Sequence, residues 1–201
     1  QRPKDEVSAL MNLFFEFLEK ELDTMLRNNI NFKLIGDRDG LPSFLQDRLT
    51  HALDSTEGNE GLLLNLALNY GGRDEIVHAA RAIAMQVKEG KLQPEKINES
   101  LISENTYTAG VPDPDLIIRT SGEKRLSNFL IWQSAYAEYF FTDVLWPDFT
   151  KNNFYEAIFE YQQRKRRMGG TSILKADSEL TNDSPLSINY KKNTKISKTS
   201  I

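Results

Sequence analysis

Two arginines and a serine stand close together after a short apolar run in the second half of the chain. The run Leu116 to Ile118 predicts a fully buried strand, and such a strand delivers Arg119 to its carboxyl end, where open α/β sheets bind ligands. Arg125 and Ser127 follow shortly after it. Guanidinium groups make charge-assisted, bidentate bonds to phosphate oxygens. The pattern therefore indicates a site for a diphosphate.

The residues around these side chains suggest two further sources of positive potential. Thr120-Ser121-Gly122 is a small-residue turn that can bring backbone N–H groups close to an anion. Ser127 is a candidate N-cap of a helix over 129–136, and a helix N-terminus carries partial positive charge. We therefore expect a hydroxyl, a helix N-terminus and two guanidiniums to converge on one spot.

Acidic residues near the arginines leave two interpretations open. Glu123 and Glu138 could orient the arginines or hold a divalent cation that bridges two phosphates. The simpler alternative is a solvated surface on which Arg119 and Arg125 pair with Glu123 and Asp115. Spacing alone does not decide between them.

Composition limits the class of protein. A chain of 201 residues with 39% hydrophobic content suits one globular domain plus a tail. A net charge of −4 argues against general nucleic-acid binding, so an anion site here must be local. The absence of cysteine excludes disulfides and thiolate metal sites and is compatible with a cytoplasmic location. No apolar run approaches the length that spans a bilayer, so we expect any membrane contact to be peripheral.

Strands that alternate with helices predict an α/β fold with a largely parallel central sheet flanked by helices. Residues from Val7 to Leu26 repeat with helical spacing and form one broad apolar face. The apolar run 62–68 predicts a central, buried parallel strand. The remaining predicted elements are strands over 31–35 and 139–145 and helices over 41–53, 76–89, 94–102 and 152–164.

The stretch from Asp115 to Phe149 closely resembles the C-terminal signature of the cis-prenyltransferases, of which undecaprenyl diphosphate synthase is the bacterial type. It contains Arg119-Thr120-Ser121-Gly122-Glu123 and Arg125-Leu126-Ser127-Asn128-Phe129. The resemblance extends over roughly residues 2 to 170. Upstream it includes Asn69-Tyr70-Gly71-Gly72-Arg73, and downstream it includes Arg166-Arg167-Met168-Gly169-Gly170.

Members of this family join isopentenyl diphosphate to an allylic diphosphate, such as farnesyl diphosphate, and use Mg²⁺. The resemblance implies that Arg119, Arg125, Leu126 and Ser127 bind substrate and that Glu138 assists the metal. It further implies that Arg2 contacts diphosphate at the mouth of a hydrophobic tunnel walled by the first helix.

The resemblance also implies partners and a location. The family forms homodimers, with the region around the last helix reaching toward the partner's active site. A lipid product would bring the cytoplasmic protein to the membrane surface peripherally.

The family's Met-Asp-Gly-Asn-Gly-Arg-Trp motif, which carries an Mg²⁺-binding Asp, is not among the 201 residues. No catalytic residue is therefore identified. A prenyltransferase with an incomplete sequence is the favoured interpretation. The alternatives are a noncatalytic partner subunit or inactive fragment of such an enzyme, and a generic α/β anion-binding module with no prenyl role.

The predicted domain covers residues 1–170. Residues 171–201 are rich in Ser, Thr, Asn and Lys, with few large apolar residues and no sustained periodicity. Such a composition cannot bury enough surface to order itself, and it predicts a disordered polar tail.

Overall fold

The computed structural model describes the backbone of residues 4–165 and the side chains of residues 9–165. Helices and parallel strands alternate along it, so the predicted α/β class is confirmed. Its longer elements are α1 (Lys4–Arg27), β1 (Asn31–Ile35), α2 (Ser43–Thr56), β2 (Leu63–Ala67), α3 (Gly72–Lys88), α4 (Glu99–Glu104), β3 (Leu116–Arg119), β4 (Glu138–Phe141) and α5 (Lys151–Gln163). Two single turns of 3₁₀ helix, η1 (Pro94–Lys96) and η2 (Trp146–Asp148), complete the set in this part of the chain.

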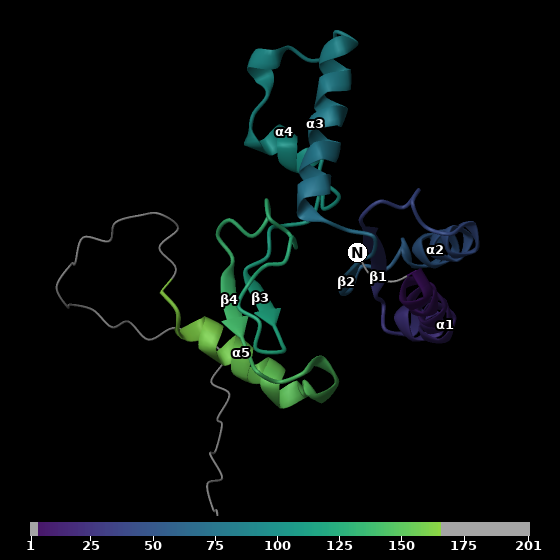
Figure 1. Ribbon diagram of the computed structural model, residues 1–201, viewed down its shortest axis with the longest axis vertical. Helices are drawn as coiled ribbons and strands as arrows, with labels where there is room; N and C mark the ends of the chain where they lie inside the picture. Colours follow the sequence, from purple (N-terminus) through teal and green to yellow (C-terminus); the bar gives the residue numbers. More distant parts are fainter. Residues whose placement is uncertain (1–3, 166–201) are drawn as a thin grey trace, which may run out of the picture. The chain divides into compact units, whose positions relative to one another are not determined.

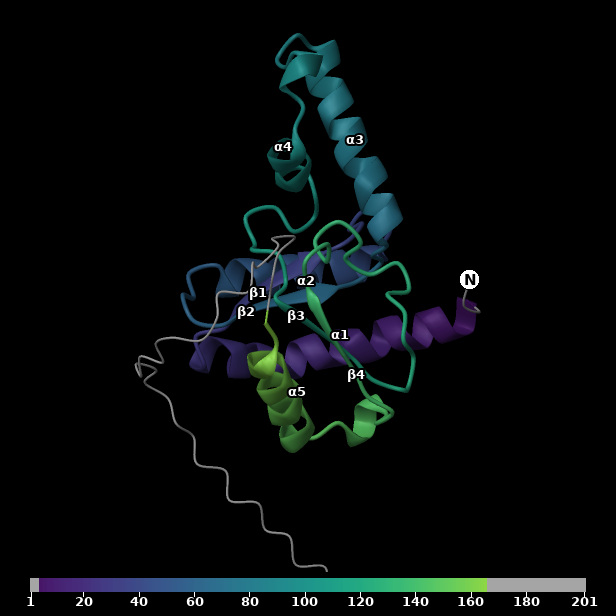
Figure 2. The same ribbon diagram turned by 90° about the vertical axis from the view of Figure 1, so that its left-hand side faces the viewer.

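The first two helices and the first strand enclose a hydrophobic core. Helix α1 lies alongside α2, and α2 packs on β1 (Figures 1 and 2). The apolar periodicity of α1 brings Leu18 and Met25 into contact with Phe32 of β1 and with Leu45 and Leu49 of α2. Leu45 and Leu49 are fully buried. The structure therefore buries part of the predicted apolar face of α1, whereas Leu10 and Leu26, which also belong to that face, stay exposed.

Strand β2 pairs with β1 in parallel, from Asn31 opposite Leu63 to Ile35 opposite Ala67. The prediction of a central, buried strand here was wrong for the described chain, because β2 has β1 as its one strand neighbour within residues 4–165. Its residues are consequently half-buried or exposed, and Leu64 is among the exposed ones.

Helix α3 begins four residues earlier than the predicted start at residue 76, and it packs against α4. The short helix predicted over 94–102 is instead η1 followed by α4, which Asn98 caps by accepting a hydrogen bond from the N–H of Leu101.

Strands β3 and β4 form a second parallel pair, and α5 packs against β4 (Figure 1). Arg119 is the last residue of β3, as predicted. The expectation that this strand is fully buried was wrong, since all four residues of β3 are only half-buried. The described strands thus form two separate pairs rather than one sheet.

The predicted helix over 129–136 does not form, and Ser127 is not a helix N-cap. The chain makes consecutive turns there, and Ser127, Asn128 and Leu130 have φ angles of 50°, 65° and 46°. These left-handed values are incompatible with a right-handed helix start. Polar contacts to α3, described below, hold the segment in this form.

Within residues 4–165, no helix is both long and apolar enough to cross a bilayer. The predicted tail at 171–201 lies outside the described residues, as do Arg2 and the Arg166-to-Gly170 stretch.

Candidate functional site

Arg119 is held in place at the carboxyl end of β3. Its Nη1 atom donates a hydrogen bond to the Oγ atom of Ser127 at 2.9 Å and another to the backbone carbonyl of Arg125. The structure therefore brings together Arg119 and Ser127, two of the predicted substrate-binding residues, and the chain of a third. A guanidinium has five N–H donors, so engagement of Nη1 leaves donors for an anion.

Arg125 is exposed, and its guanidinium forms an ion pair with Glu123. This pair is one of those expected from the simpler surface interpretation. Leu126 is half-buried, and its carbonyl accepts a hydrogen bond from the N–H of Phe129 at 3.2 Å. The predicted substrate-binding residues within the described chain thus lie at the end of β3 and in the nine-residue stretch 119–127 that begins there.

The small-residue turn after Arg119 does not present the anion site that its sequence suggested. The N–H of Ser121 donates to the carbonyl of Val144 at 2.9 Å, and the N–H of Gly122 donates to that of Thr142 at 2.9 Å. These donors hold the turn to the chain that follows β4. The two side-chain guanidiniums, and not this backbone, are left to attract an anion.

Glu138 lies at the other end of the strand pair. It is the first residue of β4 and stands opposite Leu116, whereas Arg119 stands opposite Phe141. Three residues along a strand span about 10 Å. Glu138 therefore does not orient Arg119 within one chain, as one of the sequence interpretations had it.

The carboxylate of Glu138 is half-buried and paired. Its Oε2 atom accepts a hydrogen bond from Arg164 at 2.9 Å, and Arg164 also pairs with Glu160. These two carboxylates raise the pKa of the Arg164 guanidinium. In residues 9–165 no group of three His, Asp or Glu side chains is placed to hold a metal ion. The described residues thus do not make a complete Mg²⁺ site by themselves, and the role of Glu138 as a metal ligand stays a prediction.

A buried carboxylate that the sequence analysis missed lies at the start of α3. Glu75, in the first turn of α3, is 0% exposed, yet no cationic side chain among residues 9–165 pairs with it. It accepts hydrogen bonds from the hydroxyl of Tyr70 at 2.6 Å, the N–H of Tyr107 at 2.9 Å and the amide of Gln133 at 3.1 Å. Donors thus replace a counter-ion, as a buried charge requires. Burial and the Glu75 hydrogen bond raise the pKa of Tyr70, so its hydroxyl stays a donor.

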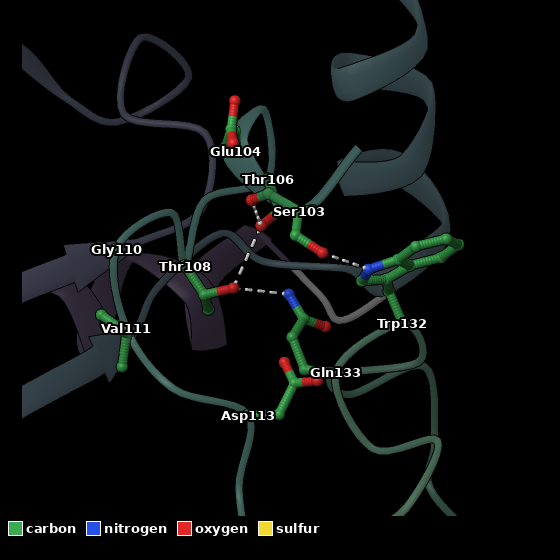
Figure 3. Close-up of a pocket in the computed structure, with 9 residues that line it drawn as sticks. All are labelled: Ser103, Glu104, Thr106, Thr108, Gly110, Val111, Asp113, Trp132 and Gln133. Atoms are coloured by element: carbon green, nitrogen blue, oxygen red, sulfur yellow. Dashed lines mark hydrogen bonds between the residues drawn. The ribbon is translucent and has the colours of Figure 1, made fainter. Parts of the chain in front are cut away.

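Gln133 joins three segments through one amide group. Its Nε2 atom donates to both carboxylate oxygens of Glu75. The same atom donates to the hydroxyl of Thr108 at 2.8 Å, as Figure 3 shows. It borders a cavity of about 100 Å³, where the indole of Trp132 donates to the hydroxyl of Ser103 at 2.9 Å. A water molecule occupies about 30 Å³ in the liquid, so this cavity has room for only a few waters and is too small for a prenyl diphosphate.

A larger recess lies beside α1. It has a volume of about 280 Å³ and is lined by side chains of α1 and α2, by the turn at 40–42 and by Asn69. Its lining includes the large apolar side chains of Met11, Leu41 and Phe44. An apolar recess against α1 is the feature that the sequence resemblance predicted for a prenyl chain.

Comparison with known proteins identifies the family of this chain. The model of the Prenyltransf family, described as undecaprenyl diphosphate synthase, matches residues 1–169. The chain belongs to the cis-prenyltransferase family. This membership confirms the predicted family, the transferase class and the α/β fold.

Relatives of this cis-prenyltransferase include the isoprenyl transferases of Streptococcus thermophilus and Bacillus subtilis. The first is 53% identical over 173 residues, which cover 84% of the chain and 70% of the relative. The second is 51% identical over 170 residues, which cover 85% of the chain and 65% of the relative.

Two solved structures are also similar to this cis-prenyltransferase. A crystal structure of lavandulyl diphosphate synthase from Lavandula x intermedia, in complex with dimethylallyl diphosphate, has a TM-score of 0.80 and 39% identity, covering 83% of this chain and 72% of that one. A probable undecaprenyl diphosphate synthase from Campylobacter jejuni has a TM-score of 0.73 and 37% identity, covering 84% and 76%.

Proposed function

We propose that this prenyltransferase condenses isopentenyl diphosphate with an allylic diphosphate, such as farnesyl diphosphate, to make a long-chain cis-polyprenyl diphosphate. The observation that carries the proposal is the turn after β3, where Arg119 is hydrogen-bonded to Ser127 and to the carbonyl of Arg125. Family membership supports diphosphates as the substrates. A preset guanidinium gains bidentate bonds to phosphate with little loss of side-chain freedom.

The apolar recess beside α1 is proposed to hold the prenyl chain. The apolar side chains of Met11, Leu41 and Phe44 line it. A simple phosphate-binding module would gain nothing from such a wall. The recess therefore favours a prenyl substrate over the generic anion-binding alternative.

The chemistry requires charge stabilisation on diphosphate. Cleavage of the allylic carbon–oxygen bond leaves negative charge on the departing diphosphate, and a bound Mg²⁺ would supply Lewis-acid stabilisation of it. We propose Glu138 as a residue that assists this metal and Arg2 as a further diphosphate contact. Within the described residues, the proposed task of Arg119, Arg125 and Ser127 is to bind and orient isopentenyl diphosphate.

We also propose that the active form is a homodimer. Trp146 of η2 is 72% exposed and Phe159 of α5 is 65% exposed, and Phe154 and Tyr155 of the same helix are exposed as well. Large aromatic side chains gathered on neighbouring elements are typical of a protein–protein interface. The lipid product would bring a cytoplasmic enzyme into peripheral contact with a membrane.

The test is equilibrium binding of isopentenyl diphosphate, measured by isothermal titration calorimetry on the parent chain and on Arg119→Ala. Hydrogen bonds to charged groups contribute roughly 1.5–3 kcal/mol, so affinity should fall by about 10- to 150-fold. Arg27→Ala, an exposed arginine at the end of α1, is the matched control and should bind like the parent. An Arg119→Ala protein that binds as tightly as the parent would refute the proposal.

Catalysis is tested separately by incorporation of labelled isopentenyl diphosphate into polyprenyl product, with farnesyl diphosphate and Mg²⁺ present. A noncatalytic partner subunit would bind the diphosphate without incorporating it. If a catalytically competent relative is then added, the mixture should incorporate more isopentenyl diphosphate than the relative does by itself. The two assays therefore distinguish an enzyme from a binding subunit.

A further inference from the structure

The first turn of α3 is capped by a residue that lies 56 positions further along the chain. The carbonyl of Asn128 accepts a hydrogen bond from the N–H of Gly72 at 2.7 Å, and its Oδ1 atom accepts one from the N–H of Arg73 at 2.9 Å. The first N–H groups of a helix have no partner within the helix. Gly71 occupies the N-cap position and has no side chain with which to satisfy them. Asn128 does so in its place.

The two glycines at 71 and 72 make this approach possible. A Cβ atom at Gly71 would lie 2.7 Å from the Nδ2 atom of Asn128, and one at Gly72 would lie 3.0 Å from the side chain of Ile131. Both values are below normal contact distances. The Gly-Gly turn is thus the place where the 127–131 segment packs against the start of α3.

Asn128, the capping residue, is adjacent in the chain to the proposed diphosphate site. Ser127 directly precedes Asn128, and its Oγ atom receives the hydrogen bond from Arg119. Ser127 and Asn128 have φ angles of 50° and 65°. Such backbone conformations are held where surrounding contacts impose them. The contacts here are the hydrogen bonds to α3 on one side and to Arg119 on the other.

The same segment is tied to α3 a second time. Gln133, which is 3% exposed, donates to both oxygens of the buried Glu75 in the first turn of α3. The two ties lie on either side of the turns at 129–132. Helix α3 thus holds the segment at both ends, although no substrate-binding residue is predicted on α3 itself.

We propose that Asn128 is a positioning residue for isopentenyl diphosphate. By capping α3 it fixes the backbone of Ser127, and through Ser127 it sets where the guanidinium of Arg119 points. The proposal rests on the proposed function, since it assigns Asn128 to the binding of that substrate.

The test compares two substitutions that tolerate a left-handed φ. Asn128→Gly permits the backbone conformation but removes the Oδ1 acceptor, whereas Asn128→Asp retains an acceptor. Asn128→Gly should weaken isopentenyl diphosphate binding by about tenfold, the effect of one well-placed hydrogen bond. Asn128→Asp should stay within about threefold of the parent. Binding is measured by calorimetry at a temperature where each variant is folded.

Asn98→Gly is the matched control. Asn98 caps α4 with its side chain in the same way, by accepting from the N–H of Leu101 at 3.0 Å, but it lies away from the arginines. Its removal should lower the melting temperature and leave the dissociation constant unchanged. A merely structural role for Asn128 would give that same result.

Gly71→Ala disturbs the same contact from the α3 side. It serves as a second variant in case substitutions at position 128 impair folding. Its new methyl group would displace the Asn128 amide, and binding should again weaken several-fold. If Arg119→Ala weakens binding but Asn128→Gly and Gly71→Ala both bind like the parent, this inference is wrong and the proposed function stands. If Arg119→Ala binds like the parent, the proposed function fails and the inference falls with it.

Discussion

The β1–β2 pair and the β3–β4 pair share parallel pairing but differ in what holds the chain beside them. Next to β1, apolar side chains from α1 and α2 meet in a core that includes Leu45 and Leu49. Next to β3, the chain is held by polar groups, with Arg119 bonded to Ser127 and Asn128 bonded to α3. Apolar packing has no directional requirement, whereas a hydrogen bond weakens steeply when its donor and acceptor are misaligned.

The difference matches the two halves of the proposed substrate. A prenyl chain needs a smooth apolar wall with no directional contacts, and the recess beside α1 offers one. A diphosphate needs donors at fixed points, and the turn after β3 offers them. The contrast predicts that substitutions in the two regions should fail in different ways.

The largest effect on stability is expected in the apolar region. Leu45 is fully buried in the core of α1, α2 and β1, so Leu45→Ala should lower the free energy of unfolding by about 2–5 kcal/mol. Urea unfolding followed by circular dichroism measures this loss. Asp47→Ala, an exposed neighbour on the same helix, is the control and should change stability by about 0.5 kcal/mol or less.

The comparison also requires that the folded fraction of Leu45→Ala bind isopentenyl diphosphate with the affinity of the parent. A large loss of affinity in the folded protein would show that the two regions are coupled more tightly than their separate contacts indicate.

Removal of the buried carboxylate should affect both stability and binding. Glu75→Ala leaves the Tyr70 hydroxyl, the Tyr107 N–H and the Gln133 amide without their acceptor. A buried unpaired group costs about 1–3 kcal/mol, so we expect a loss of roughly 3 kcal/mol. Because Gln133 ties the 127–133 segment to α3, affinity for isopentenyl diphosphate should fall as well. Urea unfolding measures the stability of Glu75→Ala, and calorimetry measures its affinity for isopentenyl diphosphate. Glu75→Ala should lose both, whereas Leu45→Ala should lose stability alone.

The segments in the apolar region were the ones that the sequence predicted well. The spacing of apolar residues gives α1 and α2, and an apolar run bounded by Gly36 gives β1. These signals are local, because the pattern of apolar residues that marks a helix or a strand repeats every few residues. The short run before Arg119 likewise predicted β3 and the place of the arginine at its end.

The polar region could not be predicted in the same way, because its contacts join distant residues. Glu75 and Gln133 are 58 positions apart, and neither has a local pattern that marks it as buried. Ser127 followed by an apolar segment has the composition of a capped helix, yet contacts with α3 impose left-handed turns there. The sequence signal for Glu75 was its place shortly after the Gly-Gly turn, in the first turn of a helix. Acidic residues are common there and are usually exposed, so this signal did not mark Glu75 as buried.

A smaller effect is expected at the hydroxyl that holds Arg119. Ser127→Ala removes the acceptor at 2.9 Å without touching the guanidinium itself. Because the bond is exposed, we expect a loss of about 1 kcal/mol, or roughly fivefold in affinity for isopentenyl diphosphate. The melting temperature should not change, which sets this variant apart from Glu75→Ala. Ser8→Ala, on α1, provides a serine control for the calorimetry, and an affinity equal to the parent in both variants would remove Ser127 from the site.

The smallest expected effect is on how the free energy of unfolding depends on pH, which should differ between substitutions in the two regions. The pKa of Tyr70 is raised in the folded protein, first by burial and then by its hydrogen bond to Glu75. Above pH 10 the unfolded chain therefore releases the tyrosine proton while the folded chain keeps it, and stability falls as pH rises. Tyr70→Phe removes this contribution, so its unfolding free energy should fall less steeply between pH 9 and about 11, as measured in urea. Some slope should persist, because burial and the nearby Asp74 also raise the pKa of Tyr107. Equal slopes in parent and variant would mean that Tyr70 does not titrate with folding, whereas Leu45→Ala should shift the whole curve without changing its slope.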